Sequence, residues 1–274
     1  MPDKPWVVLE PGNSWAAVNL RDLWTYRELF YFLIWRDVKV RYKQTILGVV
    51  WVVLQPFLAT LIFTVFLGVL ARIPSNGLPY ALVVYTGLLA WTFFSTAITG
   101  SSNSIVGSAH LVTKVYFPRM IIPGAAIGGR LVDFAISLLM AVPLMIYFRI
   151  PPTRNLLMLP VLILLITLFT WGLGMWISAT NVKYRDVGVI LPVLTQLWMF
   201  VSPVAYPVSL VPANWRWLYF LNPVAGIIEG FRAAILGTGF TWAPLAYSGV
   251  FTLILFVYAA HVFRRMERSF ADII

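Results

Sequence analysis

Residues 156–180 read LLMLPVLILLITLFTWGLGMWISAT, a run that contains no Asp, Glu, Lys or Arg. A helix needs roughly 20 residues to cross the hydrocarbon core of a bilayer, which is about 30 Å thick. The run is long enough for such a crossing and carries no charge that would oppose it. It therefore predicts a membrane-spanning helix.

Similar apolar runs lie on both sides of this segment, separated by breaks that carry charges or Pro and Gly. They predict further spans at about 46–71, 79–100, 120–148, 187–207 and 245–263. Six spans in total predict an all-α integral membrane protein. We assign a transmembrane domain to residues 46–265 and a tail to residues 266–274.

The composition excludes several classes of function. Of the 274 residues, 60% are hydrophobic and 11% are charged, whereas about 25% of the residues in soluble domains are charged. Six crossings use about 120 residues, which leaves no room for a fused ATPase domain, and no Gly-Lys dipeptide is present to form a phosphate loop. With no Cys and only His110 and His261, the sequence argues against metal sites, catalytic triads and enzyme activity.

The distribution of positive charge predicts the orientation. With the N-terminus inside, fourteen Lys and Arg residues fall in inner segments and five in outer segments, which agrees with the positive-inside rule. We therefore expect a multi-pass membrane protein with both termini in the cytoplasm. This placement accounts for the net charge of +10 without nucleic acid as a partner. The first 45 residues lack a signal-peptide pattern, and we expect no cleaved signal.

Residues 21–45, which follow a tail at 1–20, are too charged to span a membrane. They predict an amphipathic helix that lies in the cytoplasmic interface. The basic residues on one stripe of this helix are Arg36, Lys39 and Lys43. Asp37 and Arg41 lie off the stripe. Two roles remain open for the helix, a lipid-surface anchor and a docking surface for a partner.

Arg130 and Asp133 lie about 9 and 12 residues into the third predicted span, roughly 15 Å deep at 1.5 Å per residue. Ionisable groups at such depth are costly and usually face the bundle or a cavity. The spacing of three residues permits an ion pair on one helix face. Such a pair either neutralises itself and ties helices together, or contacts a charged substrate or acts in gating.

Residues 207–244 lie outside in this topology and contain two segments that are too short to span. We expect a pair of short re-entrant helices, either as a dry structural plug or as a pore-mouth element. Trp215, Trp217 and Tyr219 belong to an interfacial belt or stack on sugar rings. Glu229 and Arg232 form a local pair at a wet rim or guard an exit.

Five segments, in order, resemble the permease subunit of type-2 ABC exporters, in the branch that exports O-antigen, capsular polysaccharide or teichoic acid. They are VKVRYKQTILGVVWVVLQP at 38–56, TGLLAWTFFS at 86–95, LVTKVYFPRMIIP at 111–123, NVKYRDVG at 181–188 and NPVAGIIEGFRAAILG at 222–237. The resemblance runs from about residue 38 to the end of the chain.

The resemblance implies six spans, a homodimer and two separate ATPase subunits that bind ATP and Mg at the cytoplasmic face, so this chain itself needs no cofactor. It also implies contact with membrane lipid and a lipid-linked glycan as substrate. The residues that match the cytoplasmic helix receiving the ATPase motion are Lys114, Tyr116, Phe117, Pro118 and Arg119. If this segment transmits motion, we expect its side chains to be buried only in the complex.

By the same resemblance, residues 21–43 match an interface helix and 207–237 match short outer helices at the pore exit. The interface-helix residues expected where substrate enters are Arg36, Lys39, Arg41, Tyr42 and Lys43. We expect Arg36, Arg41 and Lys43 to receive a pyrophosphate by charge pairing. Alternative functions are a type-2 exporter of drugs or small lipids, an integral-membrane transferase acting on a lipid carrier, and a passive channel.

Overall fold

The computed structural model describes residues 24–43 and 48–273. The predicted tail at 1–20 lies outside the described residues, as do 21–23 and 44–47 of the predicted interface helix and first span. Within the described ranges the regular structure is helical, without β-strands. The prediction of an all-α integral membrane protein is confirmed.

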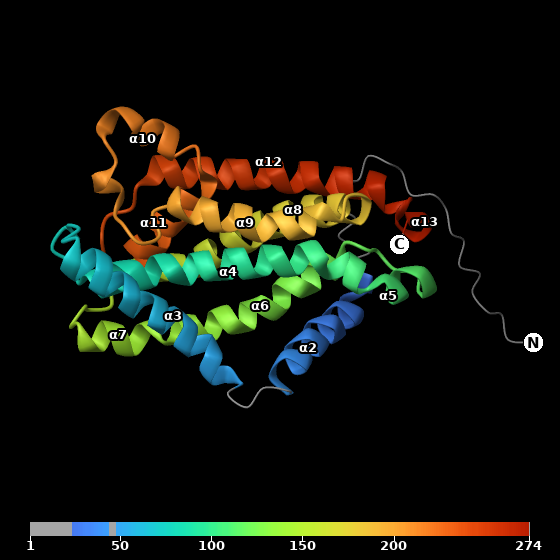
Figure 1. The fold of residues 1–274 in the computed structure, drawn as a ribbon, viewed down its shortest axis with the longest axis horizontal. Coiled ribbons are helices and arrows are strands. Elements are labelled where there is room, and N and C mark those ends of the chain that lie inside the picture. The colour runs from blue at the N-terminus through green and yellow to red at the C-terminus, as the bar shows by residue number, and fades with distance from the viewer. Residues whose placement is uncertain (1–23, 44–47, 274) are drawn as a thin grey trace, which may run out of the picture.

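Apart from α3, which runs at a slant, the long helices lie roughly along one direction, and successive ones run opposite ways (Figure 1). They are α3 (Val49–Phe63) with its π-helical continuation η1 (Thr64–Leu70), α4 (Tyr80–Gly107), α6 (Ile121–Leu139) with α7 (Ala141–Tyr147), α8 (Leu159–Lys183), α9 (Asp186–Phe200) and α12 (Trp242–Glu267). The shorter elements are α2 (Arg27–Lys43), α5 (Ala109–Lys114), η2 (Arg154–Met158), η3 (Val208–Leu210), α10 (Ala213–Tyr219), α11 (Pro223–Leu236) and α13 (Phe270–Ile273). α5 and α13 lie toward one end of the bundle, and α7, α10 and α11 toward the other.

Five of the described helices are long and apolar enough to cross a membrane. They are Val50–Leu70, Tyr80–Gly107, Ile121–Tyr147, Arg154–Lys183 and Trp242–Glu267. Each corresponds to a predicted span. The first, third and fourth are composite, because the backbone turns π-helical at Thr64, changes helix at Met140 and is 3₁₀-helical over Arg154–Met158.

The helix within the predicted span over 187–207 is shorter than the predicted segment. α9 has 15 residues and ends at Phe200, so it rises only about 22 Å at 1.5 Å per residue. Pro203 has no backbone N–H to continue a helix. The carbonyls of Pro203 and Val204 instead accept hydrogen bonds from the side chain of Arg232, at 2.7 and 3.4 Å. These contacts hold residues 201–207 in an irregular path at the end of the bundle.

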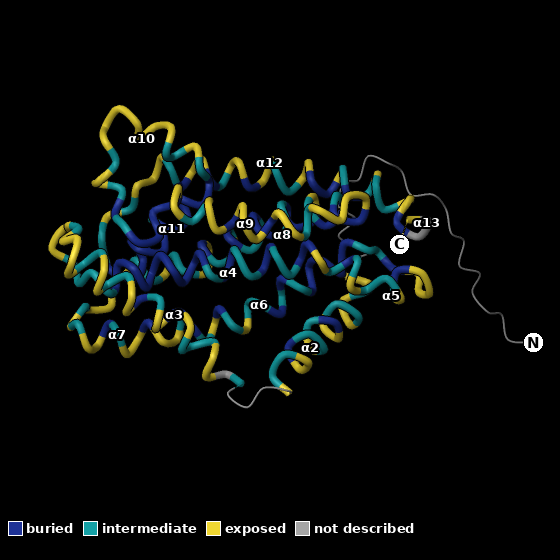
Figure 2. The backbone as a smooth tube through the Cα atoms, viewed as in Figure 1, coloured by how far each residue is buried: buried dark blue, intermediate teal, exposed yellow. Residues whose placement is uncertain are grey.

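α4 forms the centre of the bundle and packs against α3, α6, α8, α9 and α11. Figure 2 shows dark, buried backbone along α4 and α11, whereas α3 and α9 carry long exposed stretches. Phe94 of α4 packs on Phe169 of α8 and Trp198 of α9, with ring centroids 5.6 and 5.2 Å apart. α4 continues past the predicted end at residue 100 because Ser101 and Ser102 are buried and the Ser102 carbonyl accepts a hydrogen bond from Asn181.

The expected pair of short helices over 207–244 is present as α10 and α11. α10 is largely exposed, whereas thirteen of the fourteen residues of α11 are buried. Asn222 caps the N-terminus of α11 by accepting a hydrogen bond from the amide of Val224. Gly237 ends the helix in the left-handed conformation (φ 72°) that glycine adopts without steric cost. α11 is thus an internal part of the bundle, and α10 lies on its outside.

Candidate functional site

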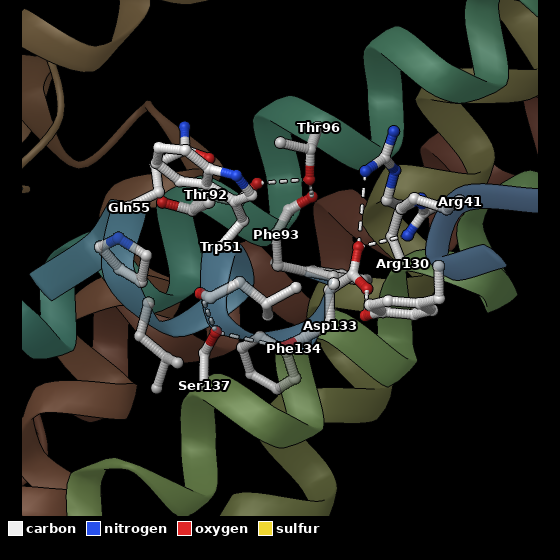
Figure 3. Close-up of a pocket in the computed structure, with 15 residues that line it drawn as sticks. Arg41, Trp51, Gln55, Thr92, Phe93, Thr96, Arg130, Asp133, Phe134 and Ser137 are labelled. Atoms are coloured by element: carbon white, nitrogen blue, oxygen red, sulfur yellow. Dashed lines mark hydrogen bonds and ion pairs between the residues drawn. The ribbon is translucent and has the colours of Figure 1, made fainter. Parts of the chain in front are cut away.

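A charged cluster joins α2 to α6. Asp133 of α6 accepts close hydrogen bonds from Arg41 and Tyr42 of α2. Arg130, one turn earlier on α6, lies 3.4 Å from the same carboxylate. Asp133 therefore holds two guanidinium groups and one phenol, and its main partners come from the other helix (Figure 3).

Two glycines of α6 lie where α2 packs, and only Gly128 is in tight contact with it. A Cβ at Gly128 would lie 2.6 Å from Cδ1 of Ile34, and a Cβ at Gly129 would lie 3.6 Å from Cβ of Asp37. The guanidinium of Arg41 also donates to the carbonyl of Gly129, at 3.4 Å. The face of α2 that carries Ile34, Asp37 and Arg41 therefore packs on α6.

Tyr42 serves as a hydrogen-bond donor to Asp133. Burial, reinforced by this hydrogen bond, raises the pKa of Tyr42 to about 12. The phenol, which is already neutral at pH 7, becomes still harder to deprotonate. Asp133 therefore accepts a hydrogen bond from an uncharged group of α2.

The cluster forms one wall of a cavity of about 200 Å³ among α2, α3, α4 and α6 (Figure 3). The remaining walls are apolar and aromatic, with a few amide and hydroxyl groups. The lining residues are Arg41, Tyr42, Gly48, Trp51, Val52, Gln55, Pro56, Leu89, Thr92, Phe93, Thr96, Arg130, Asp133, Phe134 and Ser137. The site thus combines charge on one side with aromatic surface on the other.

A second hollow of about 400 Å³ adjoins the first, with Thr96 and Arg130 lining both. It is an open hollow lined by residues of α4 and α9 together with Arg130. Five of its eight lining residues, Ser95, Thr96, Thr99, Asn103 and Thr195, carry a hydroxyl or an amide group, and Gly100 and Pro192 add apolar surface. The α4 members recur every three to four residues and so share one helix face. We call this hollow the hydroxyl groove.

The hydroxyls of the groove can still accept hydrogen bonds. Thr96 and Thr99 donate to the carbonyls four residues earlier on α4, at 2.7 and 2.8 Å. A hydroxyl oxygen has two lone pairs as well as its proton, so each remains an acceptor. The groove can therefore receive donors from a polyhydroxylated ligand, while Arg130 supplies a cation beside it.

The other basic residues of the interface helix do not reach this site. Arg36 makes its ion pair with Asp37, at 2.8 Å, and Lys39 and Lys43 are exposed. The structure brings Arg41 and Tyr42 to Arg130 and Asp133, and leaves Arg36, Lys39 and Lys43 outside the cavity lining. The expected shared site of Arg36, Arg41 and Lys43 is therefore not assembled in this structure.

The segment from Lys114 to Arg119 differs from the expectation most clearly at Phe117, and Pro118 and Arg119 are half-buried as well. Phe117 is only 4% exposed, and it belongs to a core cluster with Phe263 and Phe270. The chain itself buries this ring, because α12 and α13 turn back over the segment. Tyr116, by contrast, is 77% exposed, and Lys114 is exposed as well.

The residues expected at a pore mouth separate into two groups. Trp215 and Trp217 are 61% and 66% exposed on α10, and the Tyr219 hydroxyl donates to that of Tyr206 at 3.2 Å. Arg232 is 4% exposed and ion-pairs with Glu229. The predicted local pair is therefore present, but it is buried and does not lie at a wet rim.

Arg232 also donates to the carbonyl of Val83 in α4, at 3.3 Å. Burial raises the pKa of the Glu229 carboxyl, and the positive charge of Arg232 opposes that rise. The pair thus fastens α11 to α4 and to the irregular segment after α9.

Sequence reasoning missed the residues that complete the cavity and the hydroxyl groove, above all Trp51, Gln55, Thr96 and Thr99. The sequence contains a signal for Thr96 and Thr99, because polar residues recur at helical spacing within the otherwise apolar second span. Among the described residues, no group of three or more His, Cys, Asp or Glu side chains is placed to hold a metal ion.

Comparison with known proteins places this arrangement in a family. The ABC-2 type transporter family model matches residues 28–236. The O-antigen export system permease protein RfbA of Myxococcus xanthus is 30% identical over 256 residues, which cover 92% of this chain and 98% of that protein. RfbA of Klebsiella pneumoniae is 23% identical, with 87% and 92% covered. The polysialic acid transport protein KpsM of Escherichia coli is 24% identical, with 86% and 93% covered.

The match includes α2 at its start and α11 at its end, so the charged cluster, the cavity and the hydroxyl groove all fall within it. The multiple apolar helices agree with a multi-pass membrane protein. The chain belongs to the ABC-2 type transporter family.

Proposed function

We propose that this chain is the transmembrane permease subunit of an ATP-driven exporter that moves a lipid-linked polysaccharide across the cytoplasmic (inner) membrane. The observation that carries the proposal is similarity along nearly the whole chain to proteins named as O-antigen export permeases. A relative named for polysialic acid transport supports the same substrate class. In the proposed orientation both termini lie in the cytoplasm.

The geometry of the site agrees with such a substrate. A lipid-linked glycan combines a hydrocarbon tail, a phosphate-bearing link and many hydroxyl groups. The cavity and the hydroxyl groove offer aromatic surface, a guanidinium and a row of hydroxyl acceptors in adjoining positions. An exporter of small apolar compounds would have no use for the row of hydroxyls.

The proposed partners follow from the function and from the exposed surface. We infer a homodimer that binds two cytoplasmic ATPase subunits, and those subunits bind ATP and Mg, because this chain has no phosphate loop. The exposed Lys114 and Tyr116 are the proposed contacts with the ATPase. A two-fold dimer would place two bundles around a shared axis, in the closed symmetry that most oligomers use.

Depletion of the chain in its native cell tests the proposal. We expect surface polysaccharide to fall and the lipid-linked glycan to accumulate on the cytoplasmic side. Re-expression together with an active ATPase restores the surface polysaccharide, whereas an ATPase that binds but does not hydrolyse ATP leaves it low. Transport of glycan by the purified chain alone, without nucleotide, would instead indicate a passive channel. Unchanged surface glycan after depletion would contradict the proposed substrate.

A further inference from the structure

The charges that line the cavity do not balance. Arg41 and Arg130 are cations, and Asp133 is the single carboxylate among the described residues of the lining. Asp133 is in close contact with Arg41 and Tyr42, whereas its distance to Arg130 is 3.4 Å. The carboxylate therefore serves mainly to hold α2 on α6, and the cavity keeps an excess of positive charge at Arg130.

Arg130 also lies at the junction of two different surfaces. On one side is the cavity, with the rings of Trp51, Phe93 and Phe134, and on the other is the hydroxyl groove. The side chain of Arg130 is 29% exposed, so its guanidinium is accessible from these hollows. A guanidinium presents several N–H donors in a planar fork that fits two oxygens of a phosphate group.

We propose that Arg130 binds the phosphate-bearing link of an amphiphile, with the hydrocarbon chain on the cavity side and the sugar in the hydroxyl groove. This inference rests on the proposed function and assigns the part of the substrate that the site recognises. The ligand chemistry is a phosphate diester or pyrophosphate that carries a lipid chain. A bulk phospholipid also carries a phosphate but lacks the sugar. Free phosphate lacks both the sugar and the lipid.

The polarity of the surfaces on each side of Arg130 sets the orientation of the bound amphiphile. α3 borders the cavity, and only 11% of its apolar span is buried, with Trp51 and Phe57 about half exposed. A hydrocarbon chain that leaves the cavity along α3 therefore remains on apolar surface. The groove on the opposite side is lined by Ser95, Thr99 and Asn103, which suit sugar hydroxyls.

Calorimetric titration of the full chain in phosphatidylcholine nanodiscs tests the assignment without any ATPase. The probes are farnesyl pyrophosphate, farnesol and inorganic pyrophosphate. We expect farnesyl pyrophosphate to bind at least about tenfold more tightly than either of the others, because only it engages both the guanidinium and the apolar wall. Loss of one charge-assisted contact corresponds to a factor of about ten or more.

Three variants separate binding from folding. Arg130→Gln should weaken farnesyl pyrophosphate about tenfold and leave farnesol unchanged, whereas Arg130→Lys, which keeps the charge, should retain part of the affinity. Arg154→Gln is the control. It removes an exposed arginine of η2 that lines neither the cavity nor the groove, and it should bind farnesyl pyrophosphate like the wild type. The unfolding temperature of each variant identifies any that fails to fold, and Arg130→Lys then carries the test.

Nanodiscs of phosphatidylglycerol distinguish the possible sources of the anion. Surface repulsion by this anionic lipid weakens the binding of farnesyl pyrophosphate equally in the wild type and in Arg130→Gln, so the ratio of their two affinities is compared. A tenfold ratio that persists supports recognition of a lipid-linked phosphate, whereas loss of the ratio shows that bulk phospholipid headgroups occupy the site and overturns the assignment. Equal affinities for inorganic and farnesyl pyrophosphate would reduce the site to a free-anion site. Wild-type affinity in folded Arg130→Gln would remove Arg130 from recognition. If export by the wild type is intact in that case, the proposed function stands and only this inference fails.

Discussion

The backbone N–H of Arg119 donates a hydrogen bond of 2.8 Å to the carboxylate of Glu267, the last residue of α12. The guanidinium of Arg119 also donates to the backbone carbonyl of Glu267. The segment between α5 and α6 is thereby joined to the final long helix. Movement of this segment must therefore displace α12 as well as α6.

Glu267→Ala should loosen this joint without disturbing the rest of the bundle. An amide that loses its buried acceptor costs about 1–3 kcal/mol. We expect hydrogen–deuterium exchange to quicken across residues 115–120. Glu28→Ala removes an exposed carboxylate of α2 and serves as the matched control. Unchanged exchange in the Glu267 variant would show that the contact does not hold the segment.

Phe117→Ala should destabilise the protein by about 3–5 kcal/mol, because it empties a buried ring position between α12 and α13. Tyr116→Ala removes a neighbouring ring that is 77% exposed and should leave the unfolding temperature nearly unchanged. If this segment contacts the ATPase, Tyr116→Ala lowers ATPase co-purification several-fold, since an interface aromatic can contribute about 2 kcal/mol or more. Equal stability losses in the two variants would contradict the assignment of Phe117 to the core.

Gly87→Ala should displace the irregular segment after α9. A Cβ at Gly87 would lie 2.1 Å from the carbonyl oxygen of Val204, a distance that no packing tolerates. Either α4 or residues 202–206 must shift, and we expect a lower unfolding temperature and reduced transport. Gly249→Ala adds the same methyl group in α12 where nothing lies within 4 Å, so it should be neutral or slightly stabilising. Similar unfolding temperatures for both variants would argue against the close approach.

Arg232→Met should cost about 3–5 kcal/mol, because it removes a buried guanidinium that is the ion-pair partner of the half-buried Glu229 and that donates to the carbonyls of Val83 and Pro203. The double variant with Glu229→Gln should recover part of this loss. Burial raises the pKa of Glu229, so the folded state binds a proton more tightly than the unfolded chain does. The tighter binding of this proton stabilises the folded state fully at pH values below the pKa of Glu229 in the unfolded chain. This stabilisation is lost as the pH rises through the higher pKa of Glu229 in the folded state. Unfolding temperatures measured between pH 4 and pH 8 should therefore fall with pH more steeply in Arg232→Met than in Arg154→Met, an exposed control.

The proposed membrane orientation, with both termini in the cytoplasm, predicts the behaviour of reporter fusions. A reporter that works only outside the cytoplasm should be active after residue 214, in α10, and silent after residue 184, between α8 and α9, or at the C-terminus. Alternation of the helix directions places the link between α8 and α9 at the same end of the bundle as α13 (Figure 1). An active C-terminal fusion would contradict the proposed topology.

The sequence by itself determined the membrane class, five of the spans and the pair of short helices over 207–244. Bilayer thickness fixes the length of a spanning helix, so apolar runs and charged breaks are sufficient for these features. The ion pairs Arg130–Asp133 and Glu229–Arg232 also followed from local spacing, since residues three apart meet on one face of a helix.

Only the tertiary structure decided what these groups contact beyond their own helix. Asp133 and Arg41 are 92 residues apart in the sequence, and Arg232 and Val83 are 149 residues apart. Helical periodicity relates only residues a few positions apart, so it cannot predict these contacts. The same holds for Phe117, whose burial depends on α12 and α13 folding back over it. α9 ends early because Arg232 of α11 binds the carbonyls that follow it. Helix formation is local, whereas burial and partner choice depend on which helices the fold brings side by side.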